Sequence, residues 1–495
     1  MMNALSLSSI RAHQFDLWPA RLGLILVGLL VWVQWAAPGL VGNDGYYHLK
    51  MAALLRESLL RGDPSPDFVW LPLTILNATE YVDHHWLFHV LLTPFTTGDL
   101  ITGGKIATVV FAASALFAAG GLLRSHNVPF AAGWAVLIFA GSSAFIYRLS
   151  MLRAQSLSLL WLLFAIYLML QRRERWLAPL GLTYVWLYNA FPLMLVVAAV
   201  YFVAARLTER RWAWGALIYS ALGIALGLII NPYFPHNLTF LFHHLVAKLD
   251  IASVPVGNEW YPYTTAQLLT NAGPALLAFV AGAFALGWNR ERPTLPAVFT
   301  FGLSIVFGIM LMQSRRFVEY FPLFAILFCA FACQPLLSSQ KLRYGAATAL
   351  AGAVLLAAAF TARDVRATLA SETRPDQFAG ASQWLEAHSA KGSIVFQTDW
   401  DDFTRLFFYN SHNVYTVGLD PTYLQRADPA LYYLWVDLTK GRGLDLSADI
   451  RQHFGAQYAV SDLKHTAFLA RAESDPQLKE VYRDSNSVVF EVLEP

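Results

Sequence analysis

The sequence predicts an α-helical protein that crosses a membrane about eleven times and carries a small α/β domain at its C-terminal end. Composition is the first observation behind this prediction, since 56% of the 495 residues are hydrophobic and only 14% are charged. A soluble domain carries roughly 25% charged residues. The second observation is that apolar runs of about 17–25 residues, long enough to cross a bilayer, recur along the chain. The net charge of +2 gives no indication of nucleic-acid binding.

The apolar runs define a transmembrane domain, which we place at residues 1–374. A long first outer loop at residues 39–100 separates the first two spans. The predicted spans lie near residues 22–38, 103–123, 129–147, 155–170, 177–188, 190–205, 214–230, 269–288, 295–312, 319–337 and 345–361.

Short basic segments predict the orientation of these spans. They all fall on one side, which the positive-inside rule identifies as the cytoplasm. The N-terminus is then cytoplasmic, whereas the loops at 39–100 and 231–268 and the tail after 362 face outward. The lack of long loops of the eukaryotic type favours a bacterial plasma (inner) membrane. The basic segments are "QRRERW" (171–176), "RLTERR" (206–211), "NRERP" (289–293) and "KLR" (341–343).

Residues 375–495 have a different pattern. Charged residues return there, and turn-like stretches alternate with short β-rich runs such as "SIVFQTD" and "SVVFEVL". The stretch "DQFAGASQWLEAH" has the apolar spacing of an amphipathic helix. We therefore predict a small extracytoplasmic α/β domain over residues 375–495.

Ionisable side chains beside membrane spans are costly and usually functional. In "NDGYYHLKMAALLRE", Asp44 and His48 are four residues apart, so they share one face of a helix that we expect along the membrane surface. The alternative is structural: Asn43 or Asp44 caps this helix and His48 is incidental.

A second cluster follows in the same outer loop. In "EYVDHHWLFHVLLTPF", Asp83, His84 and His85 stand at the start of a predicted helix and His89 lies one turn after His85. A carboxylate with paired imidazoles can bind a divalent metal. Capping by Asp83, with histidines at the membrane interface, is the structural alternative.

Arginines occur on the outer side, against the positive-inside trend. "YRLSMLRAQS" contains Arg148 and Arg153, and "MQSRRFVEYFP" places Arg315 and Arg316 at the outer end of a span, beside Glu319. Guanidinium groups bind a lipid phosphate or pyrophosphate in a bidentate manner. The alternatives are interfacial snorkelling and an Arg–Glu pair that only orders the loop.

A carboxylate in a later outer loop completes the set. Glu259, in "VGNEWYPYT", has apolar and aromatic neighbours and is suited to a metal or a sugar hydroxyl, although a plain polar loop explains it equally well. Together these groups fit transfer of a sugar from a lipid phosphate. One Asp would act as general base on an acceptor hydroxyl, and arginines, with or without a metal, would neutralise the leaving phosphate.

Three short stretches carry a family resemblance. "NDGYYHLK" is similar to the first-loop acidic motif of oligosaccharyltransferase catalytic subunits, with Asp44 at its Asp. "SVPVGNEW" resembles their loop motif that ends in Glu, here Glu259. "TDWDDF" stands where those enzymes carry a Trp-Trp-Asp acceptor motif, and only Trp400 and Asp401 match it. With its many spans and outer domain, the chain resembles the GT-C superfamily of polyprenyl-phosphate-dependent glycosyltransferases.

One departure affects the metal. Oligosaccharyltransferases carry a second acidic pair after the third span, but "MLRAQSLS" contains no carboxylate. The resemblance therefore leaves open two cases. In one, Asp44, Asp83 and His85 hold Mg or Mn. In the other, no metal is needed, as in some GT-C enzymes that transfer a monosaccharide.

The resemblance implies a role for each candidate residue. The donor is a polyprenyl-phosphate-linked sugar, bound among membrane lipids, and the acceptor is a glycan, a lipid or a protein. Asp44 is the general base or a metal ligand, with His48, Asp83 and His85 as its catalytic neighbours. The donor phosphate is bound by Arg315, Arg316 and Arg153, and the acceptor side is formed by Glu259, Trp400 and Asp401.

Other functions fit parts of the pattern. An oligosaccharyltransferase-like enzyme would use a peptide acceptor. A transporter or flippase would place ionisable residues near the middle of the bilayer and often has an inverted repeat, neither of which we find in this sequence. A lipid-binding structural subunit is the remaining alternative.

Overall fold

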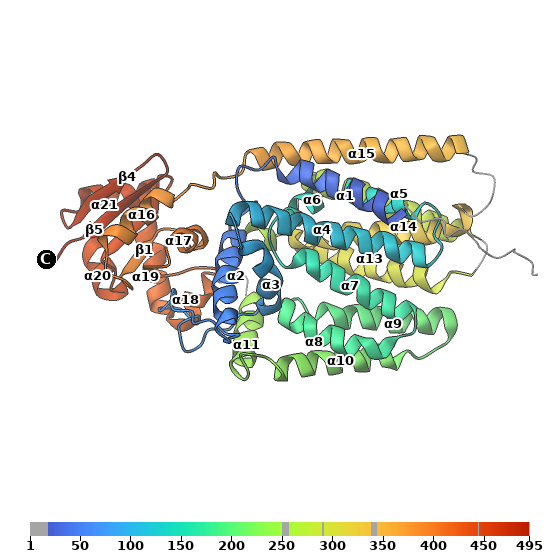
Figure 1. Ribbon diagram of the computed structural model, residues 1–495, viewed down its shortest axis with the longest axis horizontal. Helices are drawn as coiled ribbons and strands as arrows, with labels where there is room; N and C mark the ends of the chain where they lie inside the picture. Colours follow the sequence, from blue (N-terminus) through green and yellow to red (C-terminus); the bar gives the residue numbers. More distant parts are fainter. Residues whose placement is uncertain (1–17, 250–256, 290–291, 338–343, 444, 495) are drawn as a thin grey trace, which may run out of the picture.

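A helical body carries a smaller α/β unit at one end (Figure 1). The computed structural model describes residues 18–249, 257–289, 292–337, 344–443 and 445–494. The basic segment 341–343, residues 290–291 of the segment 289–293, and residues 253–256 of the "SVPVGNEW" stretch lie outside the described residues.

Each of the eleven predicted apolar segments overlaps a helix or a helix pair. The segment 129–147 corresponds to two helices, α5 and α6, which meet at 91°. The helices of the body are α1 (Trp18–Gln34), α4 (Leu100–Ser125), α5 (Ala131–Ala140), α6 (Ser143–Leu149), α7 (Gln155–Leu170), α8 (Leu177–Leu187), α9 (Leu193–Glu209), α10 (Trp214–Ile229), α12 (Thr265–Trp288), α13 (Leu295–Gln313), α14 (Phe321–Leu337) and α15 (Tyr344–Ala370).

Length and composition test how many of these helices can cross a membrane. In the part of the chain that the structure describes, α4, α12 and α13 are long and apolar enough, and the bent pair α5–α6 makes a fourth if it is one span. The predicted helical architecture is confirmed, because the apolar segments are helices. The number of eleven crossings stays a prediction.

Small residues bring neighbouring helices together, as is common in membrane proteins. Helix α8 packs along α10, where Gly181 faces the backbone of Gly223. A Cβ atom at Gly223 would collide with the backbone of Ala178, so this close approach requires glycine.

Three helices lie between the helical body and the C-terminal unit (Figure 1). They are α2 (Asp44–Leu60), α3 (Trp86–Leu92) and α11 (His236–Leu249). Short 3₁₀ turns complete the connections: η1 (Thr93–Thr96), η2 (Glu174–Trp176), η3 (Asn258–Trp260), η4 (Arg315–Glu319) and η5 (Trp400–Asp402). Helix α2 confirms the helix predicted after Asn43.

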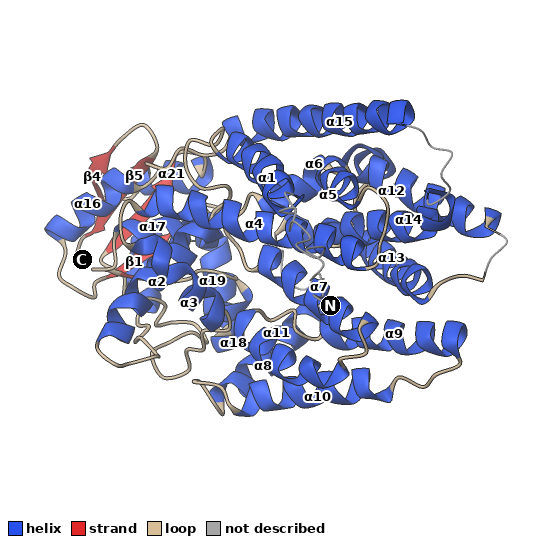
Figure 2. Ribbon diagram, turned by 45° about the vertical axis from the view of Figure 1, so that its right-hand side comes forward, coloured by secondary structure: helices blue, strands red, loops and turns tan. Residues whose placement is uncertain are grey.

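The C-terminal unit contains a five-stranded mixed sheet with strand order β2-β1-β3-β5-β4 (Figure 2). Strand β1 runs parallel to β2 and β3, and β5 runs antiparallel to β3 and β4. The strands are β1 (Ile394–Gln397), β2 (Val414–Tyr415), β3 (Tyr458–Asp462), β4 (Leu478–Arg483) and β5 (Ser487–Val492). Both β-rich runs noted in the sequence are therefore strands of this sheet.

Alternating residues of these strands face two separate cores, as the two-residue period of a strand requires. Phe396 and Phe490 pack under helices on one face, whereas Val395 and Val489 face a core that also contains Phe68 of the first outer loop. The sheet thereby docks the C-terminal unit onto the membrane domain. The helices of the unit are α16 (Ala379–His388), α17 (Phe403–Tyr409), α18 (Thr422–Ala427), α19 (Pro429–Thr439), α20 (Leu446–Phe454) and α21 (Thr466–Ser474).

Candidate active site

A polar cavity of about 540 Å³ lies where the helical body meets the C-terminal unit. Its walls come from α2, from the loop between α6 and α7, from η3 and η4, and from η5 of the C-terminal unit. Of the sequence-predicted site residues, eight line this cavity: Asp44, His48, His85, Arg153, Glu259, Arg316, Trp400 and Asp401. Asp83 and Arg315 do not.

Asp44 stands at the first position of α2, at the mouth of the first span. A parallel bridge between Val41 and Met151 holds this segment against the loop that carries Arg153. Arg153 Nη2 is 2.7 Å from Asp44 Oδ2. The expected capping role is not seen, because Asn43 occupies the N-cap position and its side chain accepts no hydrogen bond from the helix.

Three guanidinium groups converge on Glu259. Arg316 approaches its carboxylate at 2.6 Å, Arg148 at 2.7 Å and Arg153 at 3.2 Å. Burial alone would raise the pKa of Glu259, but the charges of the three arginines outweigh burial and hold this pKa well below its usual range. Arg148 is also paired with Glu319, which is almost fully buried.

The arginine cluster thus differs from the expected one in two members. Arg315 is turned away: its guanidinium donates hydrogen bonds to the carbonyls of Tyr261 and Pro262. Arg148 takes part instead, although its place in the sequence did not distinguish it from other arginines on the outer side. Glu259, expected on the acceptor side, lies at the centre of the cationic cluster.

The C-terminal unit closes the cavity through Trp400 and Asp401. Asn43 Nδ2 donates a hydrogen bond of 2.6 Å to Asp401, and Asn43 Oδ1 accepts one from Arg405. Burial, followed by the nearby charge of Asp44, raises the pKa of Asp401 to about 6. Asn43 was missed as a site residue, and only its position beside Asp44 could have indicated it.

The opposite wall of the cavity is built from histidines of the first outer loop. The rings of His48 and His85 meet edge to face at 5.1 Å, and His85 stacks on Tyr188 at 5.5 Å. Burial, together with neighbouring imidazoles, holds the pKa of both histidines well below the usual value. These rings are therefore neutral near neutral pH.

The metal expected from the sequence needs a converging set of ligands. Within the described ranges, no group of three or more His, Cys, Asp or Glu side chains is placed to hold a metal ion. Asp83 instead accepts a hydrogen bond from His89 Nδ1 at 2.6 Å and another from the backbone N–H of His85. In the described part of the chain, the predicted set of Asp44, Asp83 and His85 therefore does not fit a metal.

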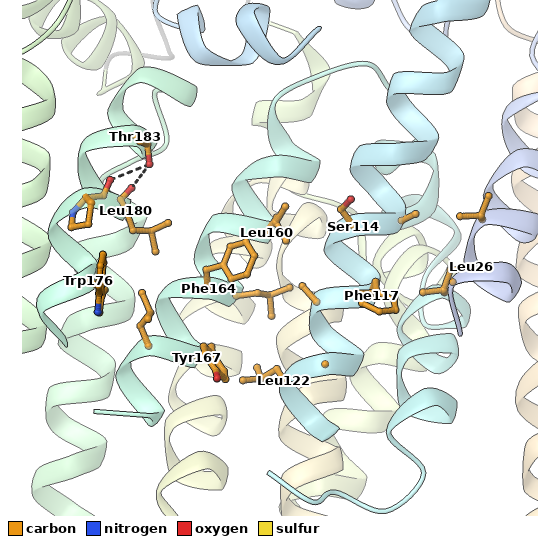
Figure 3. A pocket seen from close by; sticks show the side chains of 18 residues that line it. Leu26, Ser114, Phe117, Leu122, Leu160, Phe164, Tyr167, Trp176, Leu180 and Thr183 are labelled. Carbon is orange, nitrogen blue, oxygen red and sulfur yellow. Dashed lines mark hydrogen bonds between the residues drawn. The ribbon is translucent and has the colours of Figure 1, made fainter. Parts of the chain in front are cut away.

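A larger cavity of about 990 Å³ lies between α1, α4, α7 and α8 (Figure 3). Its lining is almost entirely apolar. The hydroxyls of Ser114 and Thr183 are bonded to backbone carbonyls of their own helices. This cavity can hold hydrocarbon, and its lining residues include no carboxylate, imidazole or guanidinium group.

Comparison with solved structures shows that the whole chain shares one fold with several glycosyltransferases. The oligosaccharyltransferase of Archaeoglobus fulgidus superposes with a TM-score of 0.66 at 13% identity, covering 97% of this chain and 75% of that one. ArnT from Cupriavidus metallidurans, in a structure bound to undecaprenyl phosphate, gives 0.58 at 16% identity, covering 97% and 100%. Mycobacterial arabinofuranosyltransferase AftD gives 0.59 at 16% identity, covering 100% and 40%.

These similarities confirm the predicted GT-C-like fold. At such low identities they establish the fold and leave the reaction to be argued from the site. No protein-family model matches the sequence, and no curated protein matches it.

Proposed function

We propose that this chain is an integral-membrane glycosyltransferase that moves a sugar from a polyprenyl phosphate to an acceptor outside the cytoplasm. The observation that carries the proposal is the cavity with Asp44 on one wall and the guanidinium groups of Arg148, Arg153 and Arg316 beside it. Structures that share the fold support it, because one contains dolichol phosphate and another undecaprenyl phosphate.

The arginines suit the leaving group. When the bond between the sugar and the phosphate breaks, negative charge grows on the phosphate oxygens. Guanidinium groups already fixed in position stabilise that charge without reorganising. In the structure described here, Glu259 holds the three arginines together and occupies the place that we assign to the donor phosphate.

Asp44 suits the acceptor. Its Oδ2 is bonded to Arg153, so the carboxylate is held next to the phosphate site. We assign it the acceptor hydroxyl, which it would orient and polarise by accepting a hydrogen bond from it. Trp400 and Asp401 would contact the rest of the acceptor from the side of the C-terminal unit.

A protein acceptor is the second candidate. Trp400 and Asp401, the two residues that match the acceptor motif of oligosaccharyltransferases, both line the cavity. One structure with the same fold is tethered to an acceptor peptide. A peptide substrate would favour this version of the reaction over transfer to a glycan or lipid.

We also propose that the eleven apolar segments all cross the plasma (inner) membrane and that the C-terminal unit lies outside the cytoplasm. The basic segment that joins α9 to α10 supports this orientation, because it lies at the far end of the helical body from the C-terminal unit (Figure 1). By the positive-inside rule, that end is cytoplasmic.

The test is sugar transfer and donor hydrolysis by the purified protein in detergent, with a panel of radiolabelled polyprenyl-phosphate sugars. We expect Asp44→Asn to lower turnover about 10²-fold, because a carboxylate no longer orients and polarises the acceptor hydroxyl. Asp437→Asn is the matched control, because Asp437 is half exposed on the C-terminal unit, away from the cavity. Equal turnover in wild type and Asp44→Asn would contradict the proposal, and an EDTA arm tests whether any metal takes part.

A further inference from the structure

Three buried side chains form a continuous hydrogen-bonded chain that ends at the cavity. Asp83 Oδ2 lies 2.6 Å from His89 Nδ1, and His89 Nε2 lies 2.8 Å from His48 Nδ1. Asp83 precedes α3, His89 is on α3, and His48 is on α2. All three are at most 5% exposed.

With Asp83 ionised and His89 neutral, hydrogen-bond chemistry fixes the protons along this chain. An ionised carboxylate can only accept, so His89 Nδ1 must donate to Asp83. In a neutral ring the other nitrogen is then an acceptor, so His89 Nε2 accepts the N–H of His48 Nδ1. By the same logic His48 Nε2 carries a lone pair. The carboxylate of Asp83 thereby makes His48 Nε2, at the other end of the chain, a proton acceptor.

That acceptor atom belongs to the cavity wall. His48 lines the cavity, and within the described ranges its Nε2 has no hydrogen-bond partner. His48 also lies one helical turn from Asp44 on α2, so both side chains lie on the same face of that helix. Burial, followed by the charges of His89, Arg153 and His84, disfavours a positive charge on its ring.

We propose that His48 Nε2 receives the proton of the acceptor hydroxyl and that Asp83 and His89 are positioning residues for this step. The inference rests on the glycosyl transfer proposed above and deepens it, because it assigns the proton a destination other than Asp44.

The acceptor oxygen bonds to the sugar carbon while the bond from that carbon to the phosphate oxygen breaks, and the bonding electrons leave with the phosphate. The hydroxyl proton passes to His48 Nε2, and the proton on His48 Nδ1 passes to His89 Nε2. The positive charge then lies on His89, beside the Asp83 carboxylate, which stabilises it.

A purely structural role explains this chain poorly. A buried carboxylate and two buried imidazoles are expensive to desolvate, and apolar residues of similar volume would pack the same site without that cost. Phe88, next to His89 on α3, shows that the region accepts such residues, since it is fully buried against the ring of His48.

Asp83→Asn is the sharpest variant. The Asn oxygen would keep the hydrogen bond that Asp83 Oδ1 accepts from the backbone N–H of His85, which turns the amide NH2 toward His89. The protons along the chain then reverse, and His48 Nε2 becomes a donor. We expect kcat for transfer to fall about 10²–10⁴-fold while the KM for the donor stays within twofold, because the arginines are untouched. We also expect kcat of the wild type to fall at acid pH, as His48 becomes protonated, and we expect this fall to be absent in Asp83→Asn. His453→Gln is the control, being half exposed on the C-terminal unit.

His48→Gln provides a second route if Asp83→Asn does not fold. This variant keeps a polar side chain on the cavity wall but removes the base. We expect the same loss of kcat, and we expect kcat no longer to fall at acid pH. If either variant folds and has the kcat and the pH profile of the wild type, the proposed proton transfer to His48 is overturned. The glycosyltransferase proposal would still stand. Absence of transfer by wild type itself would instead overturn the proposed function.

Discussion

The two walls of the cavity treat charge in opposite ways. On one wall, three arginines are paired with the carboxyl groups of Asp44, Glu259 and Glu319. On the other wall, His48 and His85 are buried and neutral. A fixed set of cations suits a ligand that arrives charged, whereas neutral imidazoles suit a proton that moves during the reaction.

The two walls also differ in how buried side chains are compensated. The arginines remain charged in a buried place because carboxylates compensate them. In the described part of the chain, neither histidine ring is paired with a carboxylate, and His48 is linked to Asp83 only through His89. We therefore expect that removing one charge from the arginine wall destabilises the protein more than adding a polar group to the histidine wall does.

The largest expected effect is on stability at the arginine wall. Glu319 is 1% exposed and pairs with Arg148, so Glu319→Gln leaves a buried guanidinium partly uncompensated. We expect the free energy of unfolding to fall by about 3–5 kcal/mol, measured by denaturant unfolding in detergent. Glu473→Gln, at an exposed pair with Arg483, should change it by less than about 1 kcal/mol. Equal stability of Glu319→Gln and wild type would show that the wall is not a coupled network.

The next effect concerns pH, at the edge of the same wall. Asp401 has a pKa of about 6, above the ordinary value, so the folded protein binds its proton more tightly than the unfolded chain does. Stability should therefore fall as the pH rises from about 4 to 6, by no more than about 3 kcal/mol. Asp401→Asn should lack this part of the decline, measured by thermal unfolding at a series of pH values. Parallel curves for the two proteins would refute the assignment.

A smaller effect tests the geometry of phosphate binding. Arg316 donates to Glu259 through Nη1 and to the hydroxyl of Tyr188 through Nη2. Arg316→Lys keeps the charge but loses this fork, so kcat/KM for the donor should fall about 10- to 100-fold. Arg442→Lys, exposed on the C-terminal unit, is the control. An equal loss in Arg315→Lys would instead make Arg315 a ligand of the phosphate.

Much of the fold could be predicted from the sequence. The apolar segments, the helix after Asn43 and the strands around 394–397 and 487–492 all follow from local composition and periodicity. Local pattern is sufficient here because an apolar run of this length has few alternatives to a helix in a membrane. The same reasoning does not fix the count of crossings, because only three helices, or four with the bent pair, pass the test of length and composition within the described ranges.

The sequence predicted most of the residues that line the site, but it did not predict which of them contact one another. Asp44 and His48 could be paired from their spacing, which a single helix determines. Glu259 could not be placed, because its partners Arg153 and Arg316 lie 106 and 57 residues away along the chain. The sequence could not separate Arg315 from Arg316 either, since adjacent residues of a 3₁₀ turn point in different directions.

By itself, the sequence determined that this chain is a helical membrane protein with acids, histidines and arginines at one face. Hydrophobic length and charge distribution are local quantities, and they need no knowledge of contacts. Tertiary structure decided which of those groups meet. In the folded chain, Arg148 contacts Glu259, Asp83 is linked to His48 by hydrogen bonds through His89, and Asp401 is hydrogen-bonded to Asn43. The reason is physical: ion pairs and hydrogen bonds act over a few ångströms, and only the packing of distant segments brings their partners within that distance.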